Sequence, residues 1–497
     1  MTDWKRVLLC LGLLLNYCSD SHQVSYGIRD FPESLDPSFG LSFDESQISS
    51  QIYENLISLN ADCETLDPQL AVNWKVSENK CSYTFTLRDN VYFHDGTKLS
   101  AYSVLKSYDW LRRKEGRSEI FDKIKRLNII DSLTFEFVLN EPYSIFLYVL
   151  ASPESFQVMS EQALKKYGNS IGRHPVGTGP FYLGNWKDNK EIQLDKYYNY
   201  WGHQGQLDKI VFKYYMNTFQ GEDYLEQNKI DILYSASSYS IDRLKWTGFI
   251  NYHTFVPVSI FFIGFNNETF PFNNKRIRRA ILEAINIPRF IHSSSRGKDI
   301  VAKGPLPPNF YEYSDKVQAE YNPENAKQIL KDLGINNLDI NFDYPRIVSA
   351  RTIKIEYLKH ELAKIGIHLK IHAHNSWPEL TQAITSDSAQ MFYDGGRSDI
   401  IGDGLNFLYG FFYSSSEFNT IRYNNPLVDK WIDEAFLEYN PEKRKRLYKK
   451  VVDKILDDTP AIFLSHVIPS LAYNKSKIKK MVTDPYGVIR FNEIELY

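Results

Sequence analysis

Residues 338–373 read LDINFDYPRIVSARTIKIEYLKHELAKIGIHLKIHA and carry the pattern that decides the fold class. Residues 338–342 and 367–373 alternate between apolar and polar residues, as strands with one buried face do. Between them, from about residue 351 to 365, apolar residues recur at helical spacing. A strand, a helix and a second strand of these lengths form a βαβ unit. The sequence therefore predicts an α/β lobe that contains a parallel pair of strands.

Further elements are predicted on both sides of this unit. Residues 259–266 form a continuous apolar run typical of a buried strand, and Asn273 or Asn274 is expected to begin the next helix. Asn322 followed by Pro323 marks another helix start. Towards the C-terminus the pattern predicts helices at about residues 427–437 and 441–456 and a strand at residues 460–464.

The N-terminal part of the chain shows a different pattern. Residues 83–87 alternate between apolar and polar with period two, and residues 91–93 are expected to return as the next strand. Ser100 is expected to cap a helix, and residues 133–139 are expected to form a further strand. The sequence therefore predicts a β-meander with an attached helix in this region.

Composition limits the class of protein. A chain of 497 residues with 43% hydrophobic and 15% aromatic content can bury a large core, and its length predicts two to four domains. Lys and Arg number 58 against 61 Asp and Glu, which gives a net charge of −3. A near-neutral chain without a basic run argues against nucleic acid as a partner.

The N-terminus predicts export from the cytoplasm. Two basic residues precede the apolar run of residues 7–15, which is too short to span a bilayer, so residues 1–17 are interpreted as a signal peptide. Cys18 follows in a context that resembles a bacterial lipoprotein box, although Tyr17 is bulkier than the usual residue there. We expect a lipid anchor on Cys18 and a location in the periplasm or on the outer face of the cytoplasmic membrane. Ordinary secretion as a soluble protein is the alternative.

Two cysteines remain after removal of the signal peptide and lipidation of Cys18. They are Cys63 and Cys81, and a leftover pair outside the cytoplasm is commonly a disulfide. A Cys63–Cys81 bridge is therefore predicted, with two reduced, buried thiols as the alternative.

Residues 392–407, FYDGGRSDIIGDGLNF, are the most distinctive stretch of the C-terminal half. They place four glycines, three aspartates and one arginine between aromatic residues. Glycine permits positive φ or close approach of another molecule, and binding residues concentrate on loops. We expect a ligand-binding loop here, with an ordinary solvated turn as the alternative.

Seven phrases, in order along nearly the whole mature chain, resemble the peptide-type solute-binding proteins of ABC importers, bacterial extracellular solute-binding protein family 5. The resemblance implies an α/β, two-lobe periplasmic-binding-protein fold of class II, peptide-binding type, with an extra subdomain. Lobe I would comprise residues 18–46, 161–260 and 466–497, the extra subdomain residues 47–160 and lobe II residues 261–465. The seven phrases are residues 66–76, 83–97, 175–181, 197–201, 264–266, 276–280 and 321–326.

The function that the resemblance implies is capture of a solute without chemistry. The two lobes would close on a peptide or peptide-like ligand, and the protein, a monomer, would deliver it to the permease and ATPase complex of an ABC importer. No enzyme activity, cofactor or metal is expected.

The resemblance also implies site residues. Asp399 matches the aspartate that pairs with the peptide amino terminus in dipeptide-binding relatives, within the phrase of residues 395–399. Arg397 adds a charge and Gly396 replaces the family's aromatic residue, so the ligand is expected to differ from a plain short peptide. Arg346 would bind the ligand carboxylate, with Arg351 as the fallback. Main-chain pairing near residues 262–266 would involve Asn266.

Other sites and functions remain alternatives. His368, His372 and His374 share one face of a predicted strand and could bind Zn²⁺ or Ni²⁺, but Lys370 on the same face is typical of a solvated surface. The aspartates of residues 392–407 do not follow the EF-hand spacing for Ca²⁺. A receptor for a nickel chelate, haem or opine is the main functional alternative, and a secreted glycoside hydrolase is a more distant one.

Overall fold

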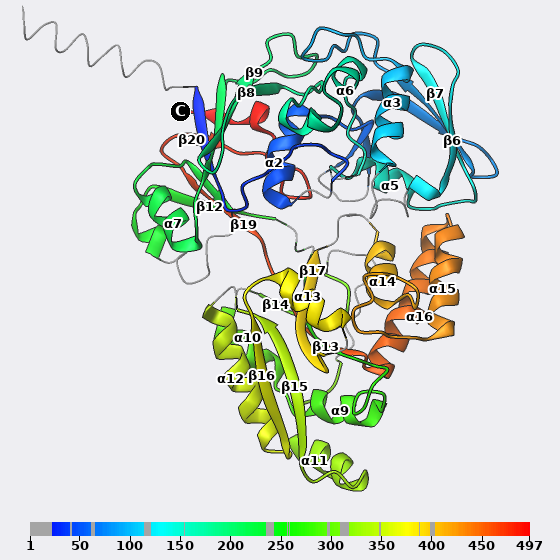
Figure 1. The fold of residues 1–497 in the computed structure, drawn as a ribbon, viewed down its shortest axis with the longest axis vertical. Helices are drawn as coiled ribbons and strands as arrows, with labels where there is room; N and C mark the ends of the chain where they lie inside the picture. Colours follow the sequence, from blue (N-terminus) through cyan, green and yellow to red (C-terminus); the bar gives the residue numbers. More distant parts are fainter. Residues whose placement is uncertain are drawn as a thin grey trace, which may run out of the picture. The chain divides into compact units, whose positions relative to one another are not determined.

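The computed structural model divides into two units, each built on its own β-sheet (Figure 1). Unit 1 comprises Met1–Pro142, Leu147–Phe255 and Pro469–Tyr497, and unit 2 comprises Tyr143–Phe146 and Val256–Ile468. The structure describes residues 22–39, 42–60, 65–113, 121–153, 155–234, 243–255, 257, 259–295, 299–308, 318–346, 349–386, 388–397 and 403–497.

A six-stranded sheet forms the centre of unit 2 and confirms the predicted βαβ unit. Its last two strands, β15 and β16, are parallel from the pair Leu338↔Ile367 to the pair Pro345↔His374. Helix α12, Ser349–Ala363, connects them. The six strands, in their order across the sheet, are β14 (Ile300–Val301), β18 (Ala461–His466), β13 (Ser259–Phe265), β17 (Met391–Arg397), β15 (Leu338–Pro345) and β16 (Ile367–His374).

Four helices bury their apolar sides on one face of this sheet. Ile281 and Leu358 from the helices pack with Phe265 and Phe342 from the strands in one buried cluster. The predicted caps are confirmed, because the Asn274 and Asn322 side chains accept hydrogen bonds from the first turns of α9 and α11. The helices are α9 (Lys275–Glu283), α10 (Ile287–Ser295), α11 (Pro323–Asp332) and α12.

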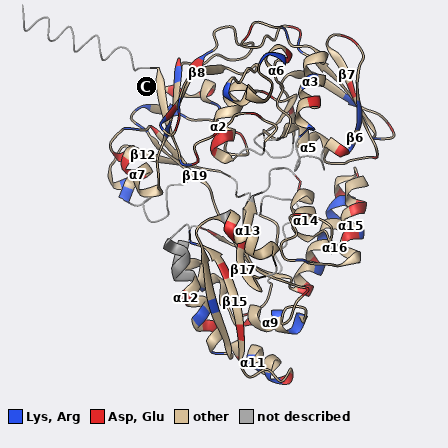
Figure 2. Ribbon diagram, viewed as in Figure 1, with Lys and Arg blue, Asp and Glu red and all other residues tan. Residues whose placement is uncertain are grey.

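The remaining helices of unit 2 include the two predicted near the C-terminus. Phe411 of α14 packs edge-on against Phe262 of β13 with ring centres 5.7 Å apart. Figure 2 shows Lys and Arg interspersed with Asp and Glu along α15 and α16, as expected of solvated amphipathic helices. These helices are α13 (Trp377–Thr385), α14 (Leu405–Phe412), α15 (Pro426–Leu437) and α16 (Pro441–Asp458).

Unit 1 is built on a seven-stranded sheet that joins both ends of the chain. Strand β1 lies between β10 and β11 and is parallel to both. Strand β19, from the C-terminal segment, lies between β11 and β12. In order across the sheet the strands are β12 (Ile250–Thr254), β19 (Ser470–Asn474), β11 (Ile232–Tyr234), β1 (Gln23–Ile28), β10 (Lys209–Tyr214), β9 (Glu191–Lys196) and β8 (Phe181–Lys187).

A separate four-stranded antiparallel sheet of unit 1 corrects the predicted meander. The strand next to β5 is β7, not residues 91–93, which make only an isolated bridge from Tyr92 to Lys98. The aromatic residues of β7 explain the difference, because Phe135 stacks on Phe85 at 5.5 Å. Ser100 caps the next helix as predicted. The elements are β4 (Ala71–Val76), β5 (Ser82–Leu87), β7 (Thr134–Leu139), β6 (Ile124–Ile129) and α3 (Ala101–Leu111).

The other elements are short and connect these sheets. None of the helices within the described ranges is long and apolar enough to cross a membrane. They are α2 (Phe43–Ile52), β2 (Ile57–Leu59), β3 (Leu66–Pro68), α5 (Phe146–Ala151), α6 (Glu161–Tyr167), η1 (Gly168–Arg173), α7 (Thr218–Glu226), β20 (Ile478–Lys480), η2 (Phe491–Glu493) and β21 (Glu495–Leu496).

Candidate ligand-binding edge of unit 2

Four strands of the unit 2 sheet end at the same edge. Strands β15 and β16 run parallel to β17, and β17 and β18 are both antiparallel to β13, so β15, β16, β17 and β18 share one direction. Strand β13 begins at that edge with Ser259. In open α/β sheets, ligands bind outside the carboxyl ends of the strands. We call the ends of these four strands, with Arg346 and Ser259, the carboxyl edge.

Two predicted site residues, Arg346 and Arg397, lie at the carboxyl edge. The backbone N–H of Arg346 donates to the His374 carbonyl at 2.7 Å, which fixes the chain just after β15, while its side chain is exposed. Arg397 is the last residue of β17 and pairs with Ser259. Because β15 and β17 are neighbouring parallel strands, the fold brings both arginines to one edge. Asp399 follows two residues later and lies outside the described residues.

Asn266, the fourth predicted site residue, follows β13 at the end opposite to Ser259, and its ligand contact stays a prediction. Its side chain is buried and accepts a hydrogen bond from the Glu268 N–H at 3.2 Å, so it stabilises a local turn. At about 3.3 Å per residue, β13 separates Asn266 from Ser259 by roughly 20 Å. The Asn266 side chain therefore takes part in this turn and is remote from the carboxyl edge.

The main-chain pairing of a ligand predicted near residues 262–266 is contradicted from Phe262 to Gly264, where β13 is paired on both sides. Strand β13 pairs with β17 along Ser259–Phe265 and with β18 on its other side. A strand paired on both sides has no free N–H and C=O row to offer. The continuous apolar run that identified the strand is the reason, because such strands occupy the middle of a sheet.

The stretch at residues 392–407 begins as a strand, which corrects the prediction of a loop throughout. Phe392 to Arg397 belong to β17, and neither Gly395 nor Gly396 has positive φ. Both glycines serve close packing. A Cβ on Gly395 would lie 2.5 Å from the Ile260 carbonyl oxygen, and one on Gly396 would lie 2.7 Å from Cζ of Phe411. The family's aromatic residue is therefore replaced here by a glycine that Phe411 covers.

Replacing Gly395 with alanine is expected to lower the free energy of unfolding by about 1–3 kcal/mol, because the new methyl group meets backbone atoms that cannot move aside. Gly410 is the matched control. A Cβ there meets nothing within 4 Å, and Gly410 lies inside α14, so Gly410→Ala should be neutral or stabilising by up to about 1 kcal/mol. Equal urea midpoints for the two variants would contradict close packing as the role of Gly395.

Two aspartates of this stretch are structural rather than exposed. Asp394 accepts hydrogen bonds from the Gly395 N–H at 2.8 Å and the Thr420 hydroxyl at 3.0 Å, and burial raises its pKa. Asp403 forms an ion pair with Arg444 at 2.8 Å and accepts hydrogen bonds from the Tyr448 hydroxyl and the Leu405 N–H. These carboxylates anchor the ends of the segment, so they do not form a Ca²⁺ loop.

His466 is a buried residue of the carboxyl edge that sequence reasoning missed. It ends β18, is fully buried, and its Nδ1–H donates to the Ser259 carbonyl at 3.0 Å. Burial lowers its pKa to about 4. Its Nε2 has no hydrogen-bond partner among the described residues. The only signal in the sequence was its position two residues after the predicted strand of residues 460–464.

Acidification is expected to destabilise the protein through His466. Its folded-state pKa of about 4 lies below the unfolded value of about 6.5, so the stability present above pH 6.5 is lost as the pH falls towards 4. The loss approaches about 1.4 kcal/mol per pH unit within that window. His466→Gln should reduce the slope of urea midpoints measured from pH 7 to pH 4.5. The slope should not vanish, because burial also lowers the pKa of His94 to about 4.

The control is His292→Gln, at an exposed position of the same unit. It measures the effect of replacing a histidine with glutamine on the protein surface. A slope for His466→Gln equal to that of the wild type would show that His466 does not titrate in this window.

The three histidines that could have bound a metal lie on a face of β16 that carries ion pairs. Lys370 of β16 pairs with Asp339 at 2.9 Å, and His374 Nε2 lies 2.8 Å from the buried Asp343 carboxylate. His372 lies 3.6 Å from the same carboxylate. Among the described residues, no group of His, Cys, Asp and Glu side chains has the arrangement of a metal site.

The cysteine predictions fall largely outside the described residues. Cys18 and Cys63 both lie there. Cys81 is half-buried, and no disulfide to it is formed within the part of the chain that the structure describes. The Cys63–Cys81 bridge and the lipidation of Cys18 stay predictions.

Known proteins resemble this chain over nearly its full length. The dipeptide-binding protein of Escherichia coli strain K12 is 26% identical over 524 aligned residues, which cover 97% of this chain and 94% of that protein. The glutathione-binding protein GsiB of Pectobacterium atrosepticum is 26% identical over 477 residues, covering 93% of this chain and 92% of that protein.

A solved structure agrees with this resemblance. The ABC transporter-associated periplasmic binding protein DppA from Helicobacter pylori, in complex with peptide STSA, superimposes with a TM-score of 0.83 at 25% identity, covering 95% of this chain and 98% of that chain. The predicted α/β periplasmic-binding-protein fold is therefore confirmed. The family described as bacterial extracellular solute-binding proteins, family 5 Middle, matches residues 65–419. The match spans more than half of the chain, and this protein belongs to the bacterial extracellular solute-binding proteins, family 5.

Proposed function

We propose that this protein captures peptides, or a peptide-like solute, outside the cytoplasm and delivers them to an ABC importer. The observation that carries the proposal is similarity along nearly the whole chain to proteins named for binding dipeptides, glutathione and the peptide STSA. Relatives named as binding proteins support a role without catalysis, so we propose no enzyme activity and no cofactor.

The carboxyl edge supplies the residues for peptide recognition in this proposal. Exposed Arg346 binds the ligand carboxylate, because its planar guanidinium can donate two parallel hydrogen bonds. Asp399 pairs with the ligand ammonium group, and Arg397 beside it favours a ligand with an additional negative charge. A peptide that carries an acidic side chain fits this set better than a neutral dipeptide.

The export and domain assignments form part of the same proposal. Residues 1–17 are a signal peptide, Cys18 carries the lipid anchor, and Cys63 pairs with Cys81. Residues 18–46, 161–260 and 466–497 form lobe I, residues 47–160 the extra subdomain and residues 261–465 lobe II. The lipid anchor holds the monomer at the outer face of the cytoplasmic membrane, close to its permease.

Identification of the co-purified ligand tests the function. The full-length protein is purified, denatured, and its released small molecules are identified by mass spectrometry. Short peptides are expected from the wild type, and the Arg346→Met variant should release fewer of them. Arg276→Met is the matched control, because Arg276 is also exposed but pairs with Asp332 at 3.6 Å on the α9–α11 side of unit 2. Release of only a nickel chelate, haem or an opine would overturn the peptide proposal in favour of that alternative.

A further inference from the structure

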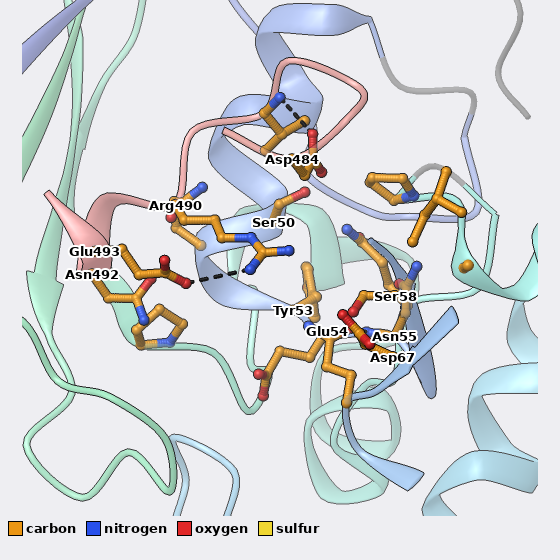
Figure 3. A pocket seen from close by; sticks show the side chains of 18 of the residues that line it. Ser50, Tyr53, Glu54, Asn55, Ser58, Asp67, Asp484, Arg490, Asn492 and Glu493 are labelled. Carbon is orange, nitrogen blue, oxygen red and sulfur yellow. Dashed lines mark hydrogen bonds and ion pairs between the residues drawn. The ribbon is translucent and has the colours of Figure 1, made fainter. Parts of the chain in front are cut away.

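Unit 1 contains a cavity of about 530 Å³, and none of the residues that line it belongs to unit 2. Figure 3 shows its wall, which is formed by the end of α2, the β2–β3 hairpin and the loop of residues 484–493. Small-molecule sites typically have volumes of about 300–1,000 Å³. The cavity is therefore large enough for a small ligand and belongs entirely to unit 1.

Two polar atoms of the cavity's lining residues are buried without partners. The Ser50 Oγ and the Gln157 Oε1 have no hydrogen-bond partner within the described part of the chain. The Gln157 side chain is 2% exposed, and its amide nitrogen already donates to the Ser49 hydroxyl at 3.3 Å. Buried polar atoms are nearly always paired, so the residues that line this cavity include two exceptions.

A cation with unused donors enters the same cavity. The Arg490 side chain extends into it (Figure 3) and makes one ion pair, from Nη1 to Glu493 Oε1, at 3.4 Å. An arginine has five N–H donors in a fixed fork. The other N–H donors of this guanidinium have no ion-pair partner among the described residues, and a guanidinium matches the geometry of a carboxylate.

A buried carboxylate completes the set. Glu54 is 3% exposed and accepts hydrogen bonds from the Tyr200 hydroxyl and the Trp201 indole N–H, both at 2.9 Å. These two donors fix its orientation, and burial raises its pKa to about 7. Arg88 lies over the Trp201 ring at 4.4 Å and donates to the Gln69 carbonyl, so it supports the wall. The same cavity thus presents the Arg490 guanidinium to an anion and the Glu54 carboxylate to a cation.

We propose that this cavity is a second ligand site that binds a free amino acid. Arg490 binds the α-carboxylate, and Glu54 accepts a hydrogen bond from the α-ammonium group. The residues that line this site belong to unit 1, whereas the carboxyl edge belongs to unit 2.

Calorimetric titration of the full-length protein with each of the twenty common L-amino acids tests the site. At least one amino acid is expected to bind with one-to-one stoichiometry. Arg490→Met should weaken that binding about tenfold or more, because a charge-assisted hydrogen-bond pair is lost. Ser58→Trp, which fills the cavity from β2 without changing Arg490, should abolish it. Arg276→Met serves again as the matched control and should bind like the wild type.

Two results would overturn this inference. Absence of binding for all twenty amino acids at millimolar concentration would leave the cavity as a water-filled space. Binding that is unchanged in both Arg490→Met and Ser58→Trp would place the amino acid elsewhere in the protein. Mass spectrometry of co-purified ligand reports on the peptide function independently, so failure of one proposal is distinguishable from failure of the other.

Discussion

Arg444→Met is expected to lower the free energy of unfolding of unit 2 by about 3–5 kcal/mol, because it leaves the Asp403 carboxylate buried without its counter-charge. Arg444 and Asp403 are 12% and 2% exposed, and their ion pair measures 2.8 Å. The hydrogen bond from Tyr448 remains in the variant but cannot neutralise a charge. The pair also joins α16 to a residue just before the start of α14, so its loss loosens the connection between these two helices.

Urea unfolding followed by circular dichroism measures this loss. Lys445→Met is the matched control, because Lys445 follows Arg444 on α16 and pairs with exposed Glu442, a contact worth at most about 1 kcal/mol. Adding Asp403→Asn to Arg444→Met should recover part of the stability, since the orphaned charge is removed. If Arg444→Met lowers the free energy of unfolding no more than Lys445→Met does, the buried ion pair does not stabilise the contact between α14 and α16.

The second large effect concerns ligand affinity. Asp399→Ala is expected to weaken binding of the co-purified peptide by about 1–3 kcal/mol, roughly five- to 150-fold, because the ligand ammonium group loses its charged partner. Asp399→Asn should lose most of the same energy, since it keeps the shape but not the charge. Calorimetry with the peptide identified by mass spectrometry gives the dissociation constants.

Asp339→Ala is the control for this experiment. Asp339 is an exposed aspartate that pairs with Lys370 at 2.9 Å near the start of β15, at the end of that strand opposite to the carboxyl edge. Its removal should change peptide affinity by less than twofold. Equal dissociation constants for Asp399→Ala and the wild type would remove Asp399 from the binding site, while the family assignment would stand.

The parts of the fold that the sequence predicted well depend on local chemistry. The βαβ unit was predictable because apolar spacing changes from strand to helix and back within residues 338–373. The caps at Asn274 and Asn322 were predictable because a cap needs only residues that are adjacent in the chain.

The errors arose where distant residues decide the structure. Gly395 and Gly396 resemble turn residues locally, yet Ile260 and Phe411 make them packing positions in a central strand. Asn266 directly follows β13, the strand next to β17, at the end away from Arg397, and the antiparallel register of these strands sets that distance. The Asp403–Arg444 pair spans 41 positions, a separation for which the sequence carries no periodic signal.

The position of β19 has a consequence for how the protein is made. Strand β12 joins the unit 1 sheet only through β19, which the ribosome produces near the end of synthesis. The sheet therefore remains incomplete until residues 470–474 have appeared, although β1 is made first. A chain that cannot finish its first sheet until its last strand emerges stays unfolded for longer, and an unfolded chain is the form that can be threaded across a membrane.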